Sequence, residues 1–362
     1  MLDSLTSKGP RPIGVDVGRS TVRMAQLSAK APGGVVMSHA TVRGTEPCDS
    51  EAYLDAAIGA VRRSIGRGTF AGRDVRIALP TELIRFKSVR LPDMPDEEIA
   101  EAIKWETDKL PGLEPQDIIS QHIPLGRVRQ GEETLREVLV MCAPLKWIES
   151  FTEAMDRLKL EVRSLEVAPT AAAEAFFRQT EPRLVVDFGG GSTRAMIVER
   201  GEVHFFKVLG PGQLEMDQRV AERLRLSIAD AAETRLAMAT EGAADRRVQE
   251  AVRETVAEIG RELSLCIRYY TASFRGERPE TGLAIGGGAA LQSLLDDVGE
   301  AAGITLTPFN PFQALGVEHK EDDCPWRSTV ALALASDPKP IKPAEASKPT
   351  APSEQAPRKE AA

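Results

Sequence analysis

Two aspartates stand at the ends of apolar runs, and each is followed by a glycine turn and a Ser-Thr pair. Residues 13–28 read IGVDVGRSTVRMAQLS and contain Asp16, while residues 184–199 read LVVDFGGGSTRAMIVE and contain Asp187. In both, a second apolar run follows the hydroxyl residues, which predicts a β-hairpin closed by glycine. Two matched copies indicate an internal repeat of one supersecondary unit.

The residue types in these turns suit a phosphate chain with a bound metal. Phosphate lies against backbone only where side chains are absent, and successive N–H groups of such a turn form an anion nest. Hydroxyls add donors, whereas an aspartate meets phosphate through a bridging Mg²⁺, so we expect Asp16 and Asp187 to position the metal. The residues expected to cradle phosphates are Gly18, Ser20, Thr21, Gly189, Gly190, Gly191, Ser192 and Thr193. The alternative is two ordinary hairpins with Asp and Gly as turn formers, which the repetition disfavours.

A third glycine element lies late in the chain. Residues 281–299, TGLAIGGGAALQSLLDDVG, predict a short strand, a triple glycine and then a helix. Glycine turns and helix N-termini favour anions and close backbone approach. A dinucleotide fingerprint is disfavoured, because Leu291 stands where its last glycine belongs.

A long amphipathic helix is predicted just before this element. Apolar residues recur at steps of three and four from Val252 to Phe274. Glu258, Arg261 and Glu262 lie off that stripe. One interpretation is a solvated face with local ion pairs, and the other has Glu258 and Arg261 reaching a ribose or adenine.

Composition limits the function classes. The 362 residues carry a formal net charge of −8, which argues against nucleic acid as a partner, and the length predicts two or three domains. Cys48, Cys142, Cys266 and Cys324 stand far apart, as reduced and mostly buried thiols of a cytosolic protein do. No stretch resembles a signal peptide or a membrane span, and the Pro-, Ala- and Lys-rich residues 337–362 are expected to be a disordered tail.

The order of the three glycine elements resembles the actin-like ATPase superfamily of actin, sugar kinases and heat-shock chaperones. The resemblance implies an α/β, actin-like (ribonuclease H-like) two-lobed fold that binds ATP and Mg²⁺, with Gly286, Gly287 and Gly288 at the adenosine. Glu166, in LEVAPTAAAEAFF at residues 165–177, matches the family's catalytic or metal-positioning acid. Gly212 leads the helix after the second phosphate loop and is a further nucleotide contact. Turnover of ATP is expected to be slow at most.

The segment between the hairpins narrows the resemblance to the type IV pilus assembly protein PilM and its competence relatives. LPDMPDEEIAEAIKWE at residues 91–106 carries a Leu-Pro pair and Trp105-Glu106, and Leu110-Pro111 follows. Further matches are LSIADAAETRLAM at residues 226–238 and an Asn-Pro-Phe segment with its closing helix near the C-terminus. The resemblance spans about residues 12–336.

This resemblance implies a domain division and a partner. The expected parts are a first lobe (12–85, 165–182 and 315–336), an inserted α+β subdomain (86–164), a second lobe (183–314) and the tail. The protein would sit at the inner face of the cytoplasmic membrane through its partners. There it would bind the cytoplasmic N-terminal peptide of a PilN-type membrane protein, with the insertion as one wall of the groove. The alternatives are a self-associating, FtsA-like filament protein of division and a small-molecule kinase of the same superfamily.

Overall fold

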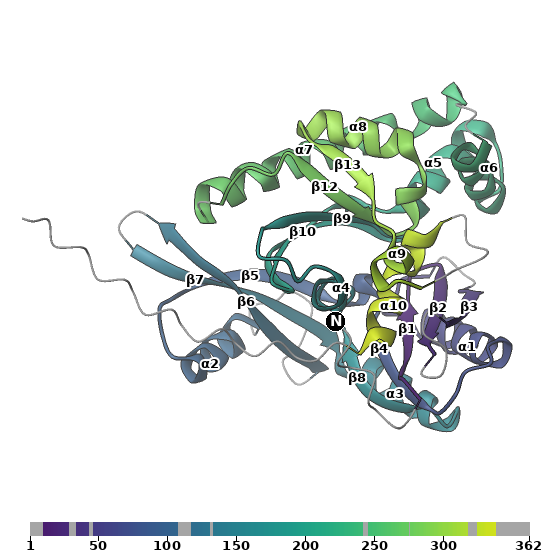
Figure 1. The fold of residues 1–362 in the computed structure, drawn as a ribbon, viewed down its shortest axis with the longest axis horizontal. Coiled ribbons are helices and arrows are strands. Elements are labelled where there is room, and N and C mark those ends of the chain that lie inside the picture. The colour runs from purple at the N-terminus through teal and green to yellow at the C-terminus, as the bar shows by residue number, and fades with distance from the viewer. Residues whose placement is uncertain are drawn as a thin grey trace, which may run out of the picture.

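The computed structural model describes residues 10–28, 34–42, 46–107, 117–130, 133–241, 245–274, 276–317 and 324–337. Within these ranges the chain forms two five-stranded sheets and one three-stranded sheet. Each large sheet with its helices makes one lobe, and the small sheet projects to one side (Figure 1). Leu110-Pro111 and the expected tail beyond Asp337 lie outside the described residues.

The first lobe is built on a mixed sheet with the strand order β3-β2-β1-β4-β8. Its strands are β1 (Ile13–Val17), β2 (Thr21–Leu27), β3 (Val35–Thr41), β4 (Asp74–Ala78) and β8 (Glu161–Glu166). The first three pair antiparallel, which confirms the first predicted hairpin, and β4 and β8 add in parallel. Helices α1 (Glu51–Arg67) and α3 (Leu145–Arg157) pack together on one side, while α4 (Ala168–Phe176) and α10 (Thr329–Ser336) pack together on the other.

The second lobe repeats this plan with the strand order β11-β10-β9-β12-β13. Its strands are β9 (Arg183–Phe188), β10 (Ser192–Glu199), β11 (Glu202–Pro211), β12 (Thr281–Ile285) and β13 (Thr305–Pro308). Its helices are α5 (Gln213–Leu224), α6 (Ile228–Glu241), α7 (Arg246–Phe274) and α8 (Gln292–Ala302). Helix α9 (Pro311–Leu315) follows β13 but packs on the first lobe, where Phe312 is buried with Ala25 and Ala331. Short 3₁₀ turns are η1 (Thr81–Leu83), η3 (Gly287–Ala290) and η4 (Pro325–Ser328). Because the antiparallel meander and the two added parallel strands recur in the same order, the repeat seen in the sequence is a repeat of the whole sheet.

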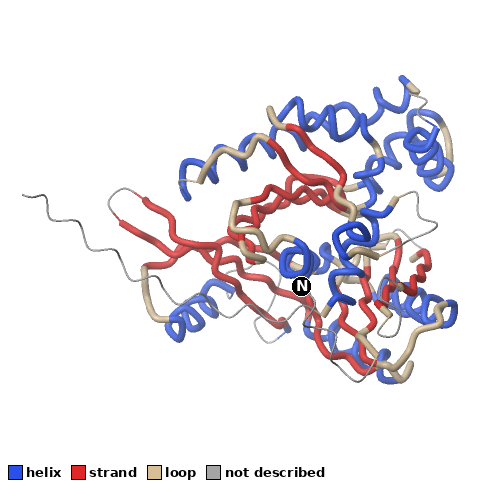
Figure 2. Tube along the Cα trace, in the orientation of Figure 1, coloured by secondary structure: helices blue, strands red, loops and turns tan. Residues whose placement is uncertain are grey.

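The predicted amphipathic helix is α7, and its apolar stripe faces the core of the second lobe. Val256, Ile259, Leu263 and Ile267 are buried together with residues of the sheet and of α8. Buried residues recur along the 29 residues of this helix, and they hold it against the second lobe. The helix therefore reaches from the outer end of the second lobe to the small sheet (Figure 2).

The small sheet is the body of the insertion. It has the order β5-β7-β6, all antiparallel, from β5 (Arg85–Pro92), β6 (Ile118–Gln130) and β7 (Glu133–Pro144), and α2 (Asp96–Thr107) covers it. Its own apolar core includes Ile99 and Ile103 of α2, which lie at the helical spacing expected from the sequence. Helix α3 and strand β8, counted with the insertion in the sequence, contact α1 and pair with β4 respectively, and so lie with the first sheet.

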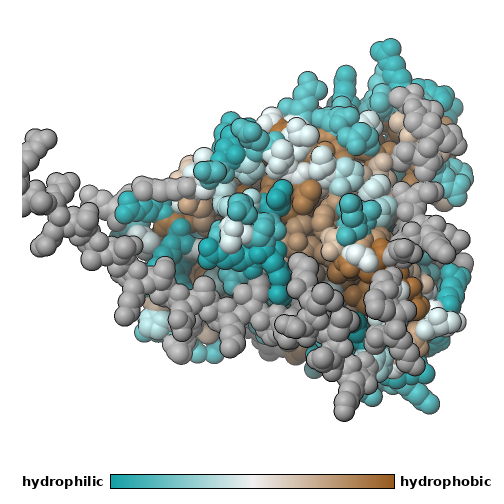
Figure 3. All heavy atoms as spheres, viewed as in Figure 1, coloured by the Kyte–Doolittle hydropathy of each residue, from teal (hydrophilic) through white to brown (hydrophobic). Residues whose placement is uncertain are grey.

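The face seen in Figure 3 carries both polar and apolar regions. Figure 3 shows hydrophilic residues along the outer helices of the second lobe, as amphipathic helices on a core require. Within the described ranges, no helix combines the length and the apolar character needed to cross a bilayer. The four cysteines are buried free thiols, as expected.

Candidate functional site

The two aspartate-tipped hairpins open into one cleft between the lobes. The cleft has a volume of about 380 Å³ and is lined by residues of both. The first hairpin contributes Asp16, Gly18, Ser20 and Thr21, the second contributes Asp187, Gly189 and Gly190, and the third glycine element contributes Gly286 and Gly287. These nine of the residues singled out in the sequence thus converge from three separated segments of the chain.

The remaining residues of the second turn and Gly212 build the wall behind the cleft. The backbone N–H groups of Gln213 and Leu214, at the start of α5, donate to the carbonyls of Gly189 and Gly190 at 3.0 and 2.9 Å. A Cβ on Gly212 would lie 2.5 Å from the backbone nitrogen of Ser192 and 2.6 Å from those two carbonyl oxygens, so only glycine fits there. The triple-glycine turn is therefore held against α5 by backbone contacts.

Thr193 and Gly191 have structural roles in the same wall. The Thr193 side chain is fully buried, and its hydroxyl donates to the carbonyl of Pro211 at 2.8 Å. A Cβ on Gly191 would lie 2.4 Å from the carboxyl carbon of Glu82, which belongs to the first lobe. The lobes therefore meet at this glycine.

The third glycine element differs in two respects from the prediction. The helix expected directly after the triple glycine begins only at Gln292, because η3 intervenes. Gly286 has φ +83°, and a Cβ on it would lie 2.5 Å from Oδ1 of Asp187. Gly288 packs against Phe188 and Gln213 and does not line the cleft. The element thus brings glycine backbone, rather than a helix N-terminus, up to Asp187.

Charged side chains of both signs meet in the cleft. In each hairpin an arginine lies opposite the aspartate in the antiparallel register, Arg23 opposite Asp16 and Arg194 opposite Asp187. Arg194 Nη2 lies 3.1 Å from Asp187 Oδ2, and both side chains are buried. Removal from solvent, and next the charge of Asp187, raise the pKa of Asp16 to about 7. Burial likewise raises the pKa of Asp187, with Arg194 opposing the shift.

Glu82 is a third cleft carboxylate that the sequence analysis missed. It lies on η1 in the first lobe, and its Oε1 accepts a hydrogen bond of 2.9 Å from the Ser192 hydroxyl in the second lobe. The contact joins residues 110 positions apart, so no local pattern marks it. This hydrogen bond joins the two lobes at the second glycine turn.

Several buried donors of the cleft have no hydrogen-bond partner. They belong to residues lining it, and the atoms are Arg19 Nη1, Arg194 Nε, Gln213 Nε2 and Trp326 Nε1. Buried donors are normally satisfied, and an orphaned one carries a desolvation cost. The Arg19 guanidinium also lies 5.3 Å from the centre of the Tyr53 ring, whose hydroxyl donates to the Gly18 carbonyl. A ligand rich in acceptor oxygens would complement this set of donors.

The residues present also fit Mg²⁺ with a nucleotide. Carboxylate oxygens are the protein ligands that Mg²⁺ prefers, and it commonly takes one or two of them, with phosphate and water completing its shell. Asp16 and Asp187 supply two, and no group of three or more His, Cys, Asp or Glu side chains in the described part of the chain forms a complete cage. Gly18, Gly189 and Gly190 bring backbone to the cleft without side chains of their own.

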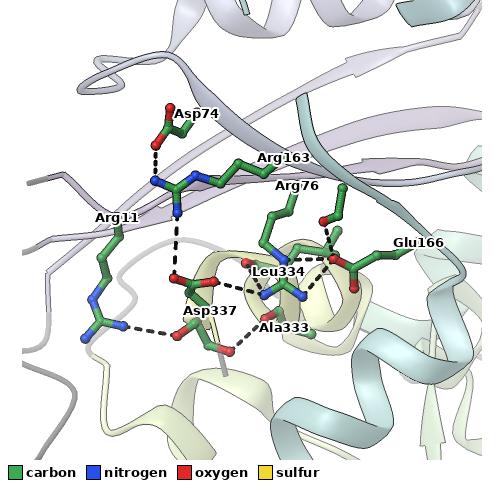
Figure 4. A network of polar contacts seen from close by, with 10 residues as sticks. Arg11, Asp74, Arg76, Arg163, Glu166, Ala333, Leu334 and Asp337 are labelled. Carbon is green, nitrogen blue, oxygen red and sulfur yellow. Dashed lines mark hydrogen bonds and ion pairs between the residues drawn. The ribbon is translucent and has the colours of Figure 1, made fainter. Parts of the chain in front are cut away.

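Glu166 is not among the residues that line this cleft. Figure 4 shows it in a polar network with Arg76. Its Oε1 accepts hydrogen bonds from Arg76 Nε at 2.8 Å and from the Ser164 hydroxyl at 2.6 Å. In the register of the sheet it is two strands away from Asp16, with Ala78 between them. The carboxylate is thus committed to a network that also ties Asp337, at the end of α10, to the first sheet.

Glu258 and Arg261 also lie outside it. They are exposed on α7 and line a separate hollow with Arg219, Arg253 and Glu254. The face of the cleft that they were expected to form comes instead from α5 and α6. There Arg235, 4% exposed, donates to Asp217 at 2.5 Å and to the carbonyl of Gln213 at 3.0 Å. Arg235 falls in the segment 226–238 that the family resemblance had already marked.

Two lobes of the same topology, closing on one cleft with a small antiparallel insertion, define an α/β protein with the actin-like fold. The family described as type IV pilus assembly protein PilM matches residues 14–335, and the chain belongs to this family.

Solved structures with a similar fold include two that match over most of both chains. The first is a chain of a "PilM-PilN type IV pilus biogenesis complex", with a TM-score of 0.69 and 22% identity over 90% of this chain and 98% of that one. The second is the ethanolamine utilization protein EutJ from Carboxydothermus hydrogenoformans, with a TM-score of 0.54 and 15% identity over 91% of this chain and 90% of that one. No curated protein sequence matches the chain.

Proposed function

We propose that this protein is an ATP-binding scaffold of the inner-membrane platform of a type IV pilus or a related secretion or competence system. In this role it binds the cytoplasmic N-terminal peptide of a PilN-type membrane protein, at the inner face of the cytoplasmic membrane. Membership of the PilM family and the likeness to a chain of a PilM-PilN complex support the partner class. The convergence of both aspartate hairpins on one cleft supports the nucleotide.

In the proposed nucleotide site Asp16 and Asp187 hold Mg²⁺, whose charge offsets that of the phosphates. Gly18, Ser20 and Thr21 bind phosphate from the first lobe, with Gly189 and Gly190 facing them from the second. Gly286 and Gly287 give the rest of the nucleotide a surface without side chains. Since Glu166 is committed to Arg76, we infer that the site binds ATP and turns it over slowly at most.

We propose that the peptide binds along the insertion, on the side that α2 covers. Helix α2 presents Trp105 to solvent with 70% of its surface exposed, the largest exposed apolar side chain in the described part of the chain. The neighbouring Glu106 is held by Lys87 of β5 at 2.9 Å, which fixes the end of α2 on the small sheet. An exposed indole on a fixed helix is typical of a binding hot spot.

Calorimetry tests the nucleotide half of the proposal. Asp187→Ala is expected to weaken Mg·ATP binding by more than tenfold, since a metal-bridging carboxylate contributes at least about 1.4 kcal/mol. Asp296→Ala, which removes an exposed aspartate of α8, serves as the matched control and should leave the affinity unchanged. Equal affinities of the Asp187 variant and the wild type would remove Asp187 from the metal site.

Fluorescence anisotropy with a labelled PilN-type N-terminal peptide tests the other half. We expect Trp105→Ala to reduce peptide affinity at least tenfold, as loss of a hot-spot tryptophan does, without lowering the Tm. Leu265→Ala, at an exposed apolar position of α7 in the second lobe, is the control. Normal peptide binding by the Trp105 variant would exclude α2 from the groove.

A further inference from the structure

The ion pair between Arg194 and Asp187 occupies the floor of the second glycine turn. The two residues face each other across β9 and β10, with Nη2 3.1 Å from Oδ2 and side chains 8% and 12% exposed. A Cβ on Gly189 would lie 2.1 Å from Arg194 Nη2. The guanidinium therefore lies directly over the glycine surface that is expected to receive phosphate.

Arg194 retains capacity for another acceptor in this position. Its Nε is buried and has no hydrogen-bond partner, although the group lines the cleft. A guanidinium stays protonated at any physiological pH and presents five donors in a planar fork that matches phosphate. An ion pair that used the whole guanidinium would leave no such unsatisfied donor.

The position of Arg194 also bears on the metal. A cation that binds Asp187 competes with the guanidinium for the same negative charge, because Arg194 Nη2 lies 3.1 Å from Asp187 Oδ2. Glu82 adds a further negative charge at the turn through its bond to Ser192, so the cleft needs a resident cation before any ligand enters. Arg194 is that cation on the second-lobe side.

We propose that Arg194 is the resident counter-cation of the second glycine turn, competing with divalent metal for Asp187 when the cleft is empty and binding phosphate when a nucleotide enters. Nucleoside diphosphate then binds with substantial affinity in the absence of metal, and divalent metal alone binds poorly. The inference rests on the proposed nucleotide site and adds to it the residue that sets its metal dependence.

The test compares ADP binding in EDTA with ADP binding in Mg²⁺, both by calorimetry. For the wild type we expect a measurable dissociation constant for ADP under both conditions. Arg194→Gln should weaken metal-free ADP binding at least tenfold, and Arg194→Lys should fall between, because it keeps the charge and loses the fork. Arg219→Gln, at a half-exposed arginine of α5 outside the cleft, is the control and should bind as the wild type does.

A second measurement follows the metal directly, with Mn²⁺ as a paramagnetic probe and no nucleotide present. Arg194→Gln should bind Mn²⁺ at least tenfold more tightly than the wild type, because the competitor for Asp187 is gone. The double variant Asp187→Asn with Arg194→Gln leaves no unpaired buried charge and should melt near the wild type. It should still lose metal-free ADP binding, which separates loss of the guanidinium from misfolding.

The outcomes separate this inference from the proposed function. A wild type that binds Mg·ADP but not metal-free ADP, or an Arg194→Gln variant with unchanged metal-free ADP and Mn²⁺ binding, overturns the role of Arg194 and leaves the nucleotide site intact. A wild type that binds no ADP under either condition overturns both.

Discussion

The hydroxyl of Tyr269, on α7 of the second lobe, donates a hydrogen bond of 2.6 Å to the carboxylate of Glu137, on β7 of the insertion. Glu137 is 4% exposed, and Arg90 of β5 lies 3.4 Å from the same oxygen. The Arg90 guanidinium also stands 5.5 Å from the centre of the Tyr269 ring. The buried Glu137 carboxylate of the insertion thus has one of its hydrogen-bond donors in the second lobe.

Other contacts join the insertion to the second lobe. The Phe86 and Phe206 rings lie 4.6 Å apart, and the ring nitrogen Nδ1 of His204 lies 3.2 Å from the carbonyl oxygen of Leu125. The insertion is joined covalently to the first lobe but packs on the second. Since α7 also packs on α8, which follows the third glycine element, closure of the lobes on a ligand would move the small sheet with the second lobe.

Tyr269→Phe removes the hydroxyl that links α7 to the insertion. We expect a loss of about 1–3 kcal/mol in the free energy of unfolding, because Glu137 stays buried with one partner fewer. The peptide affinities measured with and without Mg·ATP should also move closer together, since the insertion is released from α7. Denaturant melts and the peptide anisotropy assay measure the two effects. Tyr270→Phe, one position along α7, is the control, and an equal effect of both variants would refute a specific role for the Glu137 contact.

Gly14→Ala tests how the C-terminal helix is held to the first sheet. A Cβ at this position would lie 2.0 Å from the carbonyl oxygen of Ala331 and 2.6 Å from the backbone nitrogen of Ala335, so α10 has to move away. Overpacking against backbone of this severity should cost about 3 kcal/mol or more, read as a lower Tm. Gly66→Ala, inside α1 with open space around it, is expected to be neutral or stabilising by up to about 1 kcal/mol. A Gly14 variant as stable as the wild type would show that α10 does not pack as described.

The local parts of the site could be predicted from the sequence, and its long-range contacts could not. Asp16 and Asp187 end buried strands before glycine turns, which is a property of neighbouring residues, and the repeat implied two equivalent lobes. The partners of Arg194 and Arg235 follow from register and helix packing. The pairing of Glu166 could not be predicted either, because its partner Arg76 is 90 positions away, on a strand whose place in the sheet no local pattern gives.

Asp16→Asn should stabilise the nucleotide-free protein in EDTA at neutral and alkaline pH. The folded carboxyl holds its proton up to about pH 7, while an unfolded aspartate releases it at about pH 3.9. Between those values the folded state binds more protons, so stability falls as the pH rises through this window, and the amide removes that loss. The Tm difference should be largest above pH 7 and shrink toward pH 4. Asp245→Asn should give no such gain, since hydrogen bonds from Arg247 lower the pKa of Asp245 to about 2. A Tm difference that is constant from pH 4 to 8 would contradict the raised pKa.

Glu82→Gln should strengthen nucleotide binding. The Glu82 carboxylate holds the Ser192 hydroxyl at 2.9 Å, so a phosphate that reaches this turn meets a negative charge and has to displace it. Neutralising that charge is expected to tighten metal-free ADP binding about three- to tenfold, with a gain that shrinks as salt screens the repulsion. Calorimetry at low and high ionic strength measures both effects, with Glu149→Gln on the exposed side of α3 as the control. Weaker binding by the Glu82 variant would instead mean that this carboxylate helps to hold the ligand, and that the contact between the lobes forms part of the bound state.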